Sequence, residues 1–185
     1  GNLFICITGF KIDGHKFIED AIHRGAAAIL LEKEIHVAVT TIQVENTRTA
    51  MPQLASRFYE TPTDKLSLIG LTGTNGKTTT SYLVKSILES SNKTVGLLGT
   101  ISIKIGDKEI ESSRTTPESV DLQSLFSDMA DMKVTHAVME VSSHSLDLGR
   151  VDGCNFHTGI FTNLTQDHLD FHQTIEKYRD AKEKL

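Results

Sequence analysis

The 185-residue sequence predicts an α/β protein in two parts. We expect a small N-terminal α/β domain over residues 1–47, followed by a larger domain over residues 48–185 with a mostly parallel sheet and helices on both faces. Short apolar segments alternate along the chain with segments whose apolar residues recur at helical spacing. The pattern changes near Thr47, and a Gly-rich turn at residues 70–80 then separates an apolar strand from a helix.

The N-terminal part contains one clear helical pattern among short β segments. Phe17, Ile18, Ala21 and Ile22 recur at helical spacing, and Gly25 is placed to end that helix. The expected strands cover residues 3–7, 28–31, 37–39 and 41–44.

The second part begins with a helical stripe that ends near Pro62. Gly106 and Asp107 follow an alternating segment and predict a β-hairpin. The final helical pattern has no stop signal before Leu185, so we expect the chain to be a fragment. The expected helices cover residues 49–58, 77–90, 120–132 and 175–185, and the expected strands cover 66–71, 94–98, 101–105, 136–139 and 158–162.

Composition excludes several classes of protein. A net charge of −5 gives no electrostatic reason to expect a nucleic acid or an anionic membrane as partner. No apolar run approaches the roughly 20 residues that span a bilayer, and the N-terminus is unlike a signal peptide. Cys6 and Cys154 have no metal-ligating neighbours in sequence. We therefore expect a reduced, cytoplasmic protein, and a monomer.

The strongest motif runs from Gly70 to Thr80 and predicts a phosphate-binding loop of the P-loop NTPase type. Glycines let backbone N–H groups surround phosphate oxygens, and the helix that follows adds its positive dipole end. Lys77 supplies charge to the phosphates, and the Thr78 hydroxyl can bind Mg²⁺. Leu71 stands where the strict pattern has glycine, so the loop is a variant. The expected nucleotide-binding residues are Gly73, Thr74, Asn75, Gly76, Lys77, Thr78 and Thr79.

Later segments add candidate ligands. Glu140 ends an expected strand, where an acid can hold Mg²⁺ or remain a solvated carboxylate. His168 lies in a segment rich in ligand-type residues and can bind a second metal, whereas His144 and His172 are expected in structural or surface roles. Zinc is disfavoured because no cysteine or spaced histidine pair completes a site. The composition of residues 178–184 predicts a solvated helix face.

Several blocks in order resemble the Mur ligases, ATP-dependent enzymes that form amide bonds in peptidoglycan precursors. The N-terminal match rests on Gly1–Phe4 and Asp13–Ile18. The remaining matching blocks are Gly70–Thr80, Thr115–Glu118, Met139–Leu146 and Asn163–His172. Within the family, the blocks favour the branch that adds the third residue to UDP-N-acetylmuramoyl-L-alanyl-D-glutamate.

The resemblance implies roles for matching positions. ATP and Mg²⁺ are the implied cofactors, and a UDP-N-acetylmuramoyl dipeptide and an amino acid are the implied substrates. Lys182 falls where the family has a carbamylated lysine that binds magnesium, a role that composition does not suggest. The implied catalytic residues are Lys77, Glu140, His168 and Lys182, of which the last three also serve the metals with Thr78; Asn163 lies near the nucleotide, and Thr115, Thr116, Ser142 and Arg150 contact the acceptor.

Some features depart from the family pattern. Leu148 stands where many relatives have glutamine, and we expect the family's first segment and its C-terminal, amino-acid-binding domain to lie outside this sequence. A sister Mur or folylpolyglutamate-type ligase stays open as an alternative. A nucleotide-dependent switch or binding module is a further alternative, because a phosphate loop alone indicates only a nucleotide.

Overall fold

The computed structural model describes residues 1–9, 11–106, 108–112 and 114–185. The chain divides into two compact units, Gly1–Leu54 and Ala55–Leu185, each with its own sheet. The division falls inside helix α2 (Thr47–Phe58), whose first residue is where the sequence pattern places the boundary.

The first unit is a parallel three-stranded sheet with strand order β1-β2-β3. Its core contains Cys6, Ile18, Ile29 and Leu31. Gly25 has a φ of +91° and ends the first helix, as the sequence predicts, because glycine adopts this conformation without steric cost. The elements are β1 (Asn2–Ile5), the 3₁₀ helix η1 (Gly14–Phe17), α1 (Ile18–His23), β2 (Ala26–Leu31), β3 (Thr40–Gln43) and the first part of α2.

One expected strand of this unit is wrong. Residues 37–39 form no strand and instead have an irregular conformation before β3. Val37 and Val39 still pack against the core, so their apolar side chains report burial and not β structure.

The second unit is a six-stranded sheet with strand order β7-β6-β5-β8-β4-β9. The four strands β5, β8, β4 and β9 are parallel, and β6 and β7 form an antiparallel hairpin. Asp107 of the expected hairpin turn lies outside the described residues. The elements are η2 (Pro62–Lys65), β4 (Ser67–Thr72), α3 (Lys77–Ser90), β5 (Val95–Leu98), β6 (Ser102–Ile105), β7 (Lys108–Glu111), α4 (Ser119–Asp131), β8 (His136–Glu140), α5 (Ser143–Asp147), β9 (Phe156–Phe161), α6 (Leu169–His172) and α7 (Ile175–Lys182).

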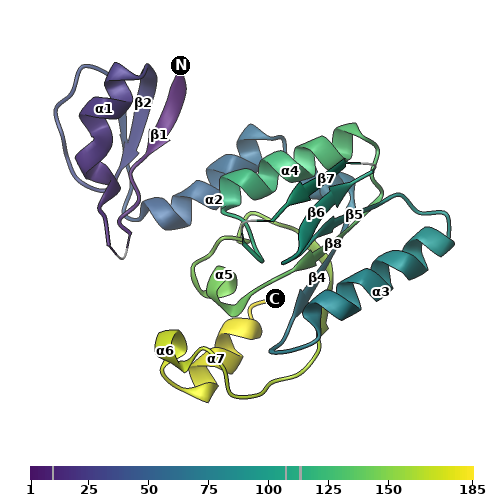
Figure 1. Ribbon diagram of the computed structural model, residues 1–185. Helices are drawn as coiled ribbons and strands as arrows, with labels where there is room; N and C mark the ends of the chain where they lie inside the picture. The colour runs from purple at the N-terminus through teal and green to yellow at the C-terminus, as the bar shows by residue number, and fades with distance from the viewer. Residues whose placement is uncertain (10, 107, 113) are drawn as a thin grey trace. The chain divides into compact units, whose positions relative to one another are not determined.

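Helices cover both faces of this sheet (Figure 1). On one face, Phe126 of α4 packs with Leu68 and Met139. On the other, Leu88 of α3 packs with Leu71 and Val138. Neighbouring strand residues belong to different clusters because successive side chains point to opposite faces of the sheet. Parallel strands with helices on both faces confirm the predicted mostly parallel α/β class.

The parallel strands end at one edge of the sheet, and that edge positions the candidate site. Thr72 ends β4, Leu98 ends β5, Glu140 ends β8 and Phe161 ends β9. Segments that follow such strands are where ligands bind in α/β sheets. Among the described residues, no helix has the length and apolar character needed to cross a membrane.

Candidate active site

The predicted phosphate loop lies between β4 and α3, the context that the motif requires. Gly73 and Gly76 have φ values of +143° and +80°, so both need the conformational freedom of glycine. A Cβ at Gly73 would overlap the hydroxyl of Thr162. The loop is therefore shaped by glycine at the two positions where another side chain would be strained.

Lys77 folds back over its own loop. Its Nζ donates to the carbonyl oxygens of Gly73 and Thr74, each at 2.9 Å. Burial lowers the pKa of Lys77, and the carboxylates of Glu140 and Asp167 act in the opposite direction. An anionic ligand on the loop would therefore compensate a cation that is partly removed from water.

Glu140 is fully buried at the end of β8, which contradicts the alternative of a solvated carboxylate. Its Oε2 accepts from the Thr78 hydroxyl at 2.9 Å and from the Thr100 hydroxyl at 3.1 Å. Its Oε1 accepts from the backbone N–H of Thr100 at 3.1 Å. The carboxylate thus joins the first turn of α3 to the segment after β5.

The segment after β9 fastens the phosphate loop. Asn75 donates its N–H to Oδ1 of Asn163 and accepts from Nδ2 of Asn163, both at 3.0 Å. Thr74 donates its N–H to the Asn163 carbonyl at 2.9 Å. Asn163 therefore contacts the loop directly, and its place near a nucleotide stays a prediction, while Thr79 is exposed on the first turn of α3.

Lys182 reaches the same loop from α7. The side chain is buried, its Nζ donates to the Gly73 carbonyl at 2.8 Å, and it lies 4.5 Å from the centre of the Tyr178 ring. Burial, helped by repulsion from Lys77, lowers its pKa to about 8. The interpretation of residues 178–184 as a solvated face is wrong, because α7 packs Tyr178, Ala181 and Lys182 inward.

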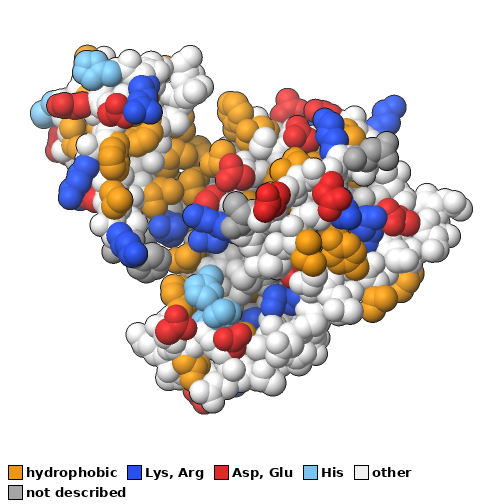
Figure 2. Space-filling model, viewed as in Figure 1, with side chains coloured by type: hydrophobic (Ala, Val, Ile, Leu, Met, Phe, Trp, Pro, Cys, Tyr) orange, Lys and Arg blue, Asp and Glu red, His pale blue; other side chains and the backbone are white. Residues whose placement is uncertain are grey.

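Three histidines form a cluster that also contacts the Tyr178 ring. The rings of His144 and His168 have centres 4.9 Å apart, and histidine side chains lie beside acidic ones on the face shown in Figure 2. His168 is half exposed, whereas His172 is buried with its Nε2 2.9 Å from Oγ of Ser143. Within the described residues, no group of three or more His, Cys, Asp or Glu side chains is arranged to hold a metal, so a metal on His168 stays a prediction.

The four expected acceptor contacts lie around Glu140. The Thr116 hydroxyl donates to the Glu140 carbonyl at 3.0 Å and accepts from the Ser142 N–H at 3.1 Å. Arg150 donates to the Thr116 carbonyl at 3.3 Å. Thr115 reaches the same group through Thr100, because the two hydroxyl oxygens are 3.1 Å apart.

Sequence reasoning missed two residues of this site. Thr100 lies two residues after the predicted strand 94–98, and its place at the carboxyl end of a parallel strand was the available signal. Tyr178 donates its hydroxyl to Oγ1 of Thr74 at 3.2 Å, across 104 residues of sequence. No local pattern signals that second contact.

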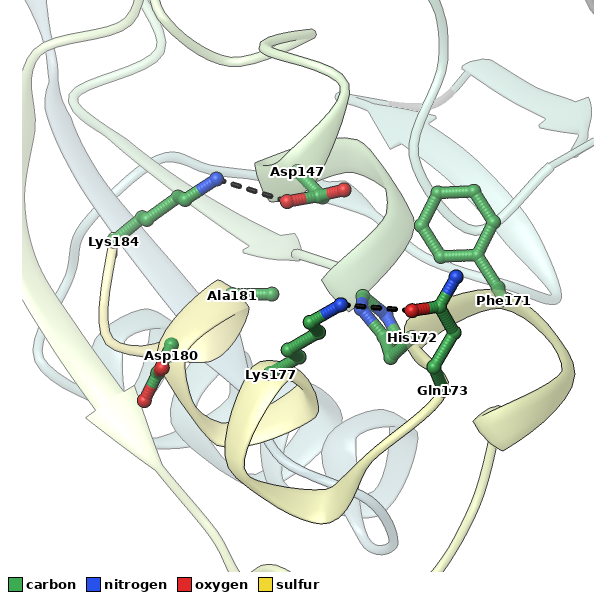
Figure 3. Close-up of a pocket in the computed structure, with 8 residues that line it drawn as sticks. All are labelled: Asp147, Phe171, His172, Gln173, Lys177, Asp180, Ala181 and Lys184. Atoms are coloured by element: carbon green, nitrogen blue, oxygen red, sulfur yellow. Dashed lines mark hydrogen bonds and ion pairs between the residues drawn. The ribbon is translucent and has the colours of Figure 1, made fainter.

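A pocket of about 320 Å³ lies beside the site, between α5, α6 and α7 (Figure 3). Its two lysines contact partners within the pocket lining: Lys184 donates to Asp147 at 3.0 Å, and Lys177 donates to Gln173 at 2.7 Å. The lining contains no predicted site residue. It consists of Asp147, Phe171, His172, Gln173, Lys177, Asp180, Ala181 and Lys184.

Both parts of the chain match domains of the same family of known proteins. Residues 71–185 match the Mur ligase middle domain, and residues 1–59 match the Mur ligase family catalytic domain. The UDP-N-acetylmuramoyl-L-alanyl-D-glutamate–2,6-diaminopimelate ligase of Alkaliphilus oremlandii (strain OhILAs) is 60% identical over 185 residues, which is 100% of this chain and 38% of that protein. The protein of the same name from Clostridium perfringens (strain 13 / Type A) is 52% identical over 100% of this chain and 39% of its own length. The chain thus spans under two fifths of the length of these relatives.

Solved structures of Mur ligases superpose on the whole chain. A UDP-N-acetylmuramoyl-L-alanyl-D-glutamate–2,6-diaminopimelate ligase superposes with a TM-score of 0.86 at 33% identity, covering 100% of this chain and 38% of that one. A MurF ligase from Thermotoga maritima in complex with ADP superposes with a TM-score of 0.65 at 24% identity, covering 100% of this chain and 39% of that one. The second likeness supports the fold alone.

Proposed function

The chain belongs to the Mur ligase family, and we propose that it provides the ATP-binding and acceptor-binding parts of the ligase that adds the third amino acid to UDP-N-acetylmuramoyl-L-alanyl-D-glutamate. One observation carries the proposal. The fully buried Glu140 joins the phosphate-loop helix at Thr78 to the expected acceptor contacts at Thr116 and Ser142. The Glu140 carboxylate contacts the nucleotide side and its backbone carbonyl contacts the acceptor side, an arrangement that suits a transfer between two bound substrates.

The residues present fit a magnesium nucleotide. Thr78 and Glu140 offer hydroxyl and carboxylate oxygens 2.9 Å apart, the oxygen donors that Mg²⁺ prefers. Lys77 lies on loop carbonyls with its pKa lowered by burial, so a phosphate would stabilise its charge. When bound, Mg²⁺ supplies positive charge that offsets the negative charge of the phosphates.

The proposed reaction activates a carboxyl group. The D-glutamyl carboxylate takes the γ-phosphoryl group of ATP and becomes an acyl phosphate with release of ADP, and the amine of the incoming amino acid then displaces phosphate to form the amide. Lys77 holds the phosphates, and Thr115, Thr116, Ser142 and Arg150 orient the acceptor. Their contribution is positioning and neutralisation of charge.

Lys182 and His168 complete the proposed metal site. A pKa of about 8 leaves an appreciable neutral fraction of Lys182 near neutral pH, and the neutral amine is the form that reacts with CO₂, forming the N–C bond of a carbamate and releasing one amine proton to solvent. The carbamate would turn a cation beside the loop into a carboxylate-like magnesium ligand. His168 is accessible to a second ion because its side chain is half exposed.

The names of the relatives indicate the amino acid and the setting. The similar proteins are named for 2,6-diaminopimelate, so we propose that amino acid as the one added. We also propose that the protein acts in the cytoplasm as a monomer. Its two cysteines, which are free thiols, favour a reducing compartment.

Nucleotide titration tests the proposed function. The 185-residue chain is titrated with a non-hydrolysable ATP analogue and MgCl₂ by calorimetry, and UDP-N-acetylmuramoyl dipeptide is added in a thermal-shift assay. We expect binding of the nucleotide and a rise in Tm with the dipeptide. Lys77→Ala should weaken nucleotide binding by at least about tenfold, the effect of losing a charged contact to phosphate.

A matched control lies on the same helix. Lys85 lies eight residues beyond Lys77 in α3 and pairs with Glu89, so Lys85→Ala should leave nucleotide affinity unchanged. Equal affinities for Lys77→Ala and the unaltered chain would contradict the assignment of the loop. In a full-length protein that carries this chain, Lys77→Ala should abolish ligation.

A further inference from the structure

Four side chains form a continuous line of hydrogen bonds across the site. The line runs from Thr78 to Glu140, then to Thr100, and ends at Thr115, with oxygen separations of 2.9, 3.1 and 3.1 Å. Glu140 is fully buried, whereas Thr100 is exposed. Thr100 therefore connects a buried carboxylate to the surface where an acceptor would lie.

The number of hydroxyl protons determines which group donates in each hydrogen bond of this line. The Thr100 hydroxyl has one proton and lies 3.1 Å from both Oε2 of Glu140 and Oγ1 of Thr115. A carboxylate only accepts, so the Thr100 proton points to Glu140 and the Thr115 hydroxyl supplies the proton between the two threonines. The orientation of Thr115 thus bears on how firmly Thr100 holds Glu140.

The carboxylate keeps room for one more partner. A carboxylate has about four acceptor positions. The hydroxyls of Thr78 and Thr100 and the backbone N–H of Thr100 occupy three of them. The turn approaches closely because residue 99 is glycine: a Cβ there would lie 2.7 Å from Oε1 of Glu140. The position left is suited to a cation.

We propose that Thr100 is a positioning residue that orients the Glu140 carboxylate for Mg²⁺ and links it to the acceptor side through Thr115. The proposal rests on the proposed function, because it takes Glu140 as a magnesium ligand. Thr100 does not touch the nucleotide in this scheme. Removing the Thr100 hydroxyl should therefore reduce the gain in nucleotide affinity that Mg²⁺ provides. The affinity measured without Mg²⁺ should not change.

The test measures affinity for a non-hydrolysable ATP analogue with MgCl₂ and with EDTA in the 185-residue chain. Thr100→Val keeps the shape and the backbone N–H but removes the hydroxyl. We expect it to reduce the Mg²⁺-dependent gain in affinity by about tenfold, the effect of losing a hydrogen bond to a charged group. Affinity in EDTA should stay within about twofold, and Thr100→Ser should restore the gain.

A double-mutant cycle tests the link to the acceptor side. Thr115→Val should reduce the gain by about threefold, since it removes only the outer proton donor. Because Thr115 acts through Thr100, the double variant should be no worse than Thr100→Val alone. Additive losses would show that the two threonines act independently and would overturn the link.

Controls separate the possible failures. Thr135→Val removes a hydroxyl that donates to the Thr94 carbonyl at the opposite end of β8, and it should leave the gain unchanged. If Thr100→Val does not fold, Thr115→Val carries the test, and an unchanged gain in that variant overturns the proposal. If the unaltered chain binds no nucleotide, the proposed function fails and this inference fails with it. If the chain binds but Thr100→Val retains the full gain, the inference alone fails.

Discussion

Two lysines from distant parts of the chain donate to the same carbonyl oxygen, that of Gly73. Lys77 lies four residues away and reaches it at 2.9 Å, while Lys182 lies 109 residues away and reaches it at 2.8 Å. Burial lowers the pKa of both, and for Lys182 the value falls to about 8. The first lysine is held by the local turn of the loop, and the second is held by the packing of α7. The phosphate loop thus depends on a local motif and also on tertiary contacts.

Removing the support under Lys182 should have the largest effect on stability. The Tyr178 ring is 1% exposed and lies beneath the Lys182 ammonium. Tyr178→Leu should lower the free energy of unfolding by about 2–3 kcal/mol, because it leaves a cavity, removes the aromatic face beneath a buried cation and removes the hydroxyl that donates to Thr74. Urea unfolding measures the change, and a loss below about 0.5 kcal/mol would indicate that α7 does not hold the site.

Tyr178→Phe separates the ring from its hydroxyl. This change keeps the aromatic face under Lys182 and removes only the bond to Thr74. We expect a loss of about 1 kcal/mol in the same urea experiment. A loss as large as that of Tyr178→Leu would mean that the hydroxyl, not the ring, fixes α7.

A pH series tests the lowered pKa of Lys182. The unfolded chain keeps the Lys182 proton up to its ordinary pKa of 10.5, whereas the folded protein releases it near pH 8. Between these values the unfolded state binds more protons, so this residue makes stability rise with pH over that window. Below pH 8 both states are protonated and the cost of burial is present in full.

Urea midpoints from pH 7 to 10 measure this slope. Lys182→Met removes the titrating group while keeping an unbranched side chain, and it should flatten the rise between pH 8 and 10. The exposed Lys184, paired with Asp147, provides the control variant Lys184→Met, which should keep the slope. An identical slope in Lys182→Met would show that the residue titrates as an exposed lysine.

The predictable parts of the site depend on local sequence. The loop from Gly73 to Lys77 needs glycines and a following helix at fixed spacing, and Glu140 directly ends an apolar strand. The structure places both at the same edge, as parallel strands require. Apart from residues 37–39, the predicted strands and long helices agree with the structure within a few residues because their apolar periodicity reflects burial.

Other parts depend on long-range contacts. The short helices α5 and α6 are too brief to produce a periodic pattern. Lys182 is buried only because Tyr178 and the Gly73 carbonyl receive it, and composition could not distinguish it from Lys184. Val37 and Val39 led to a wrong strand prediction, because buried apolar residues in an irregular segment give the same sequence pattern as a strand.

One titration tests most directly whether the loop and Glu140 form a single magnesium–nucleotide site. Mg²⁺ is added to the chain with a non-hydrolysable ATP analogue, and the unaltered chain is compared with Glu140→Gln, which keeps the size of the side chain and removes its charge. We predict that Mg²⁺ strengthens nucleotide binding in the unaltered chain and that Glu140→Gln loses this gain while binding in EDTA is preserved. An undiminished gain in Glu140→Gln would show that the loop and Glu140 do not form one magnesium–nucleotide site.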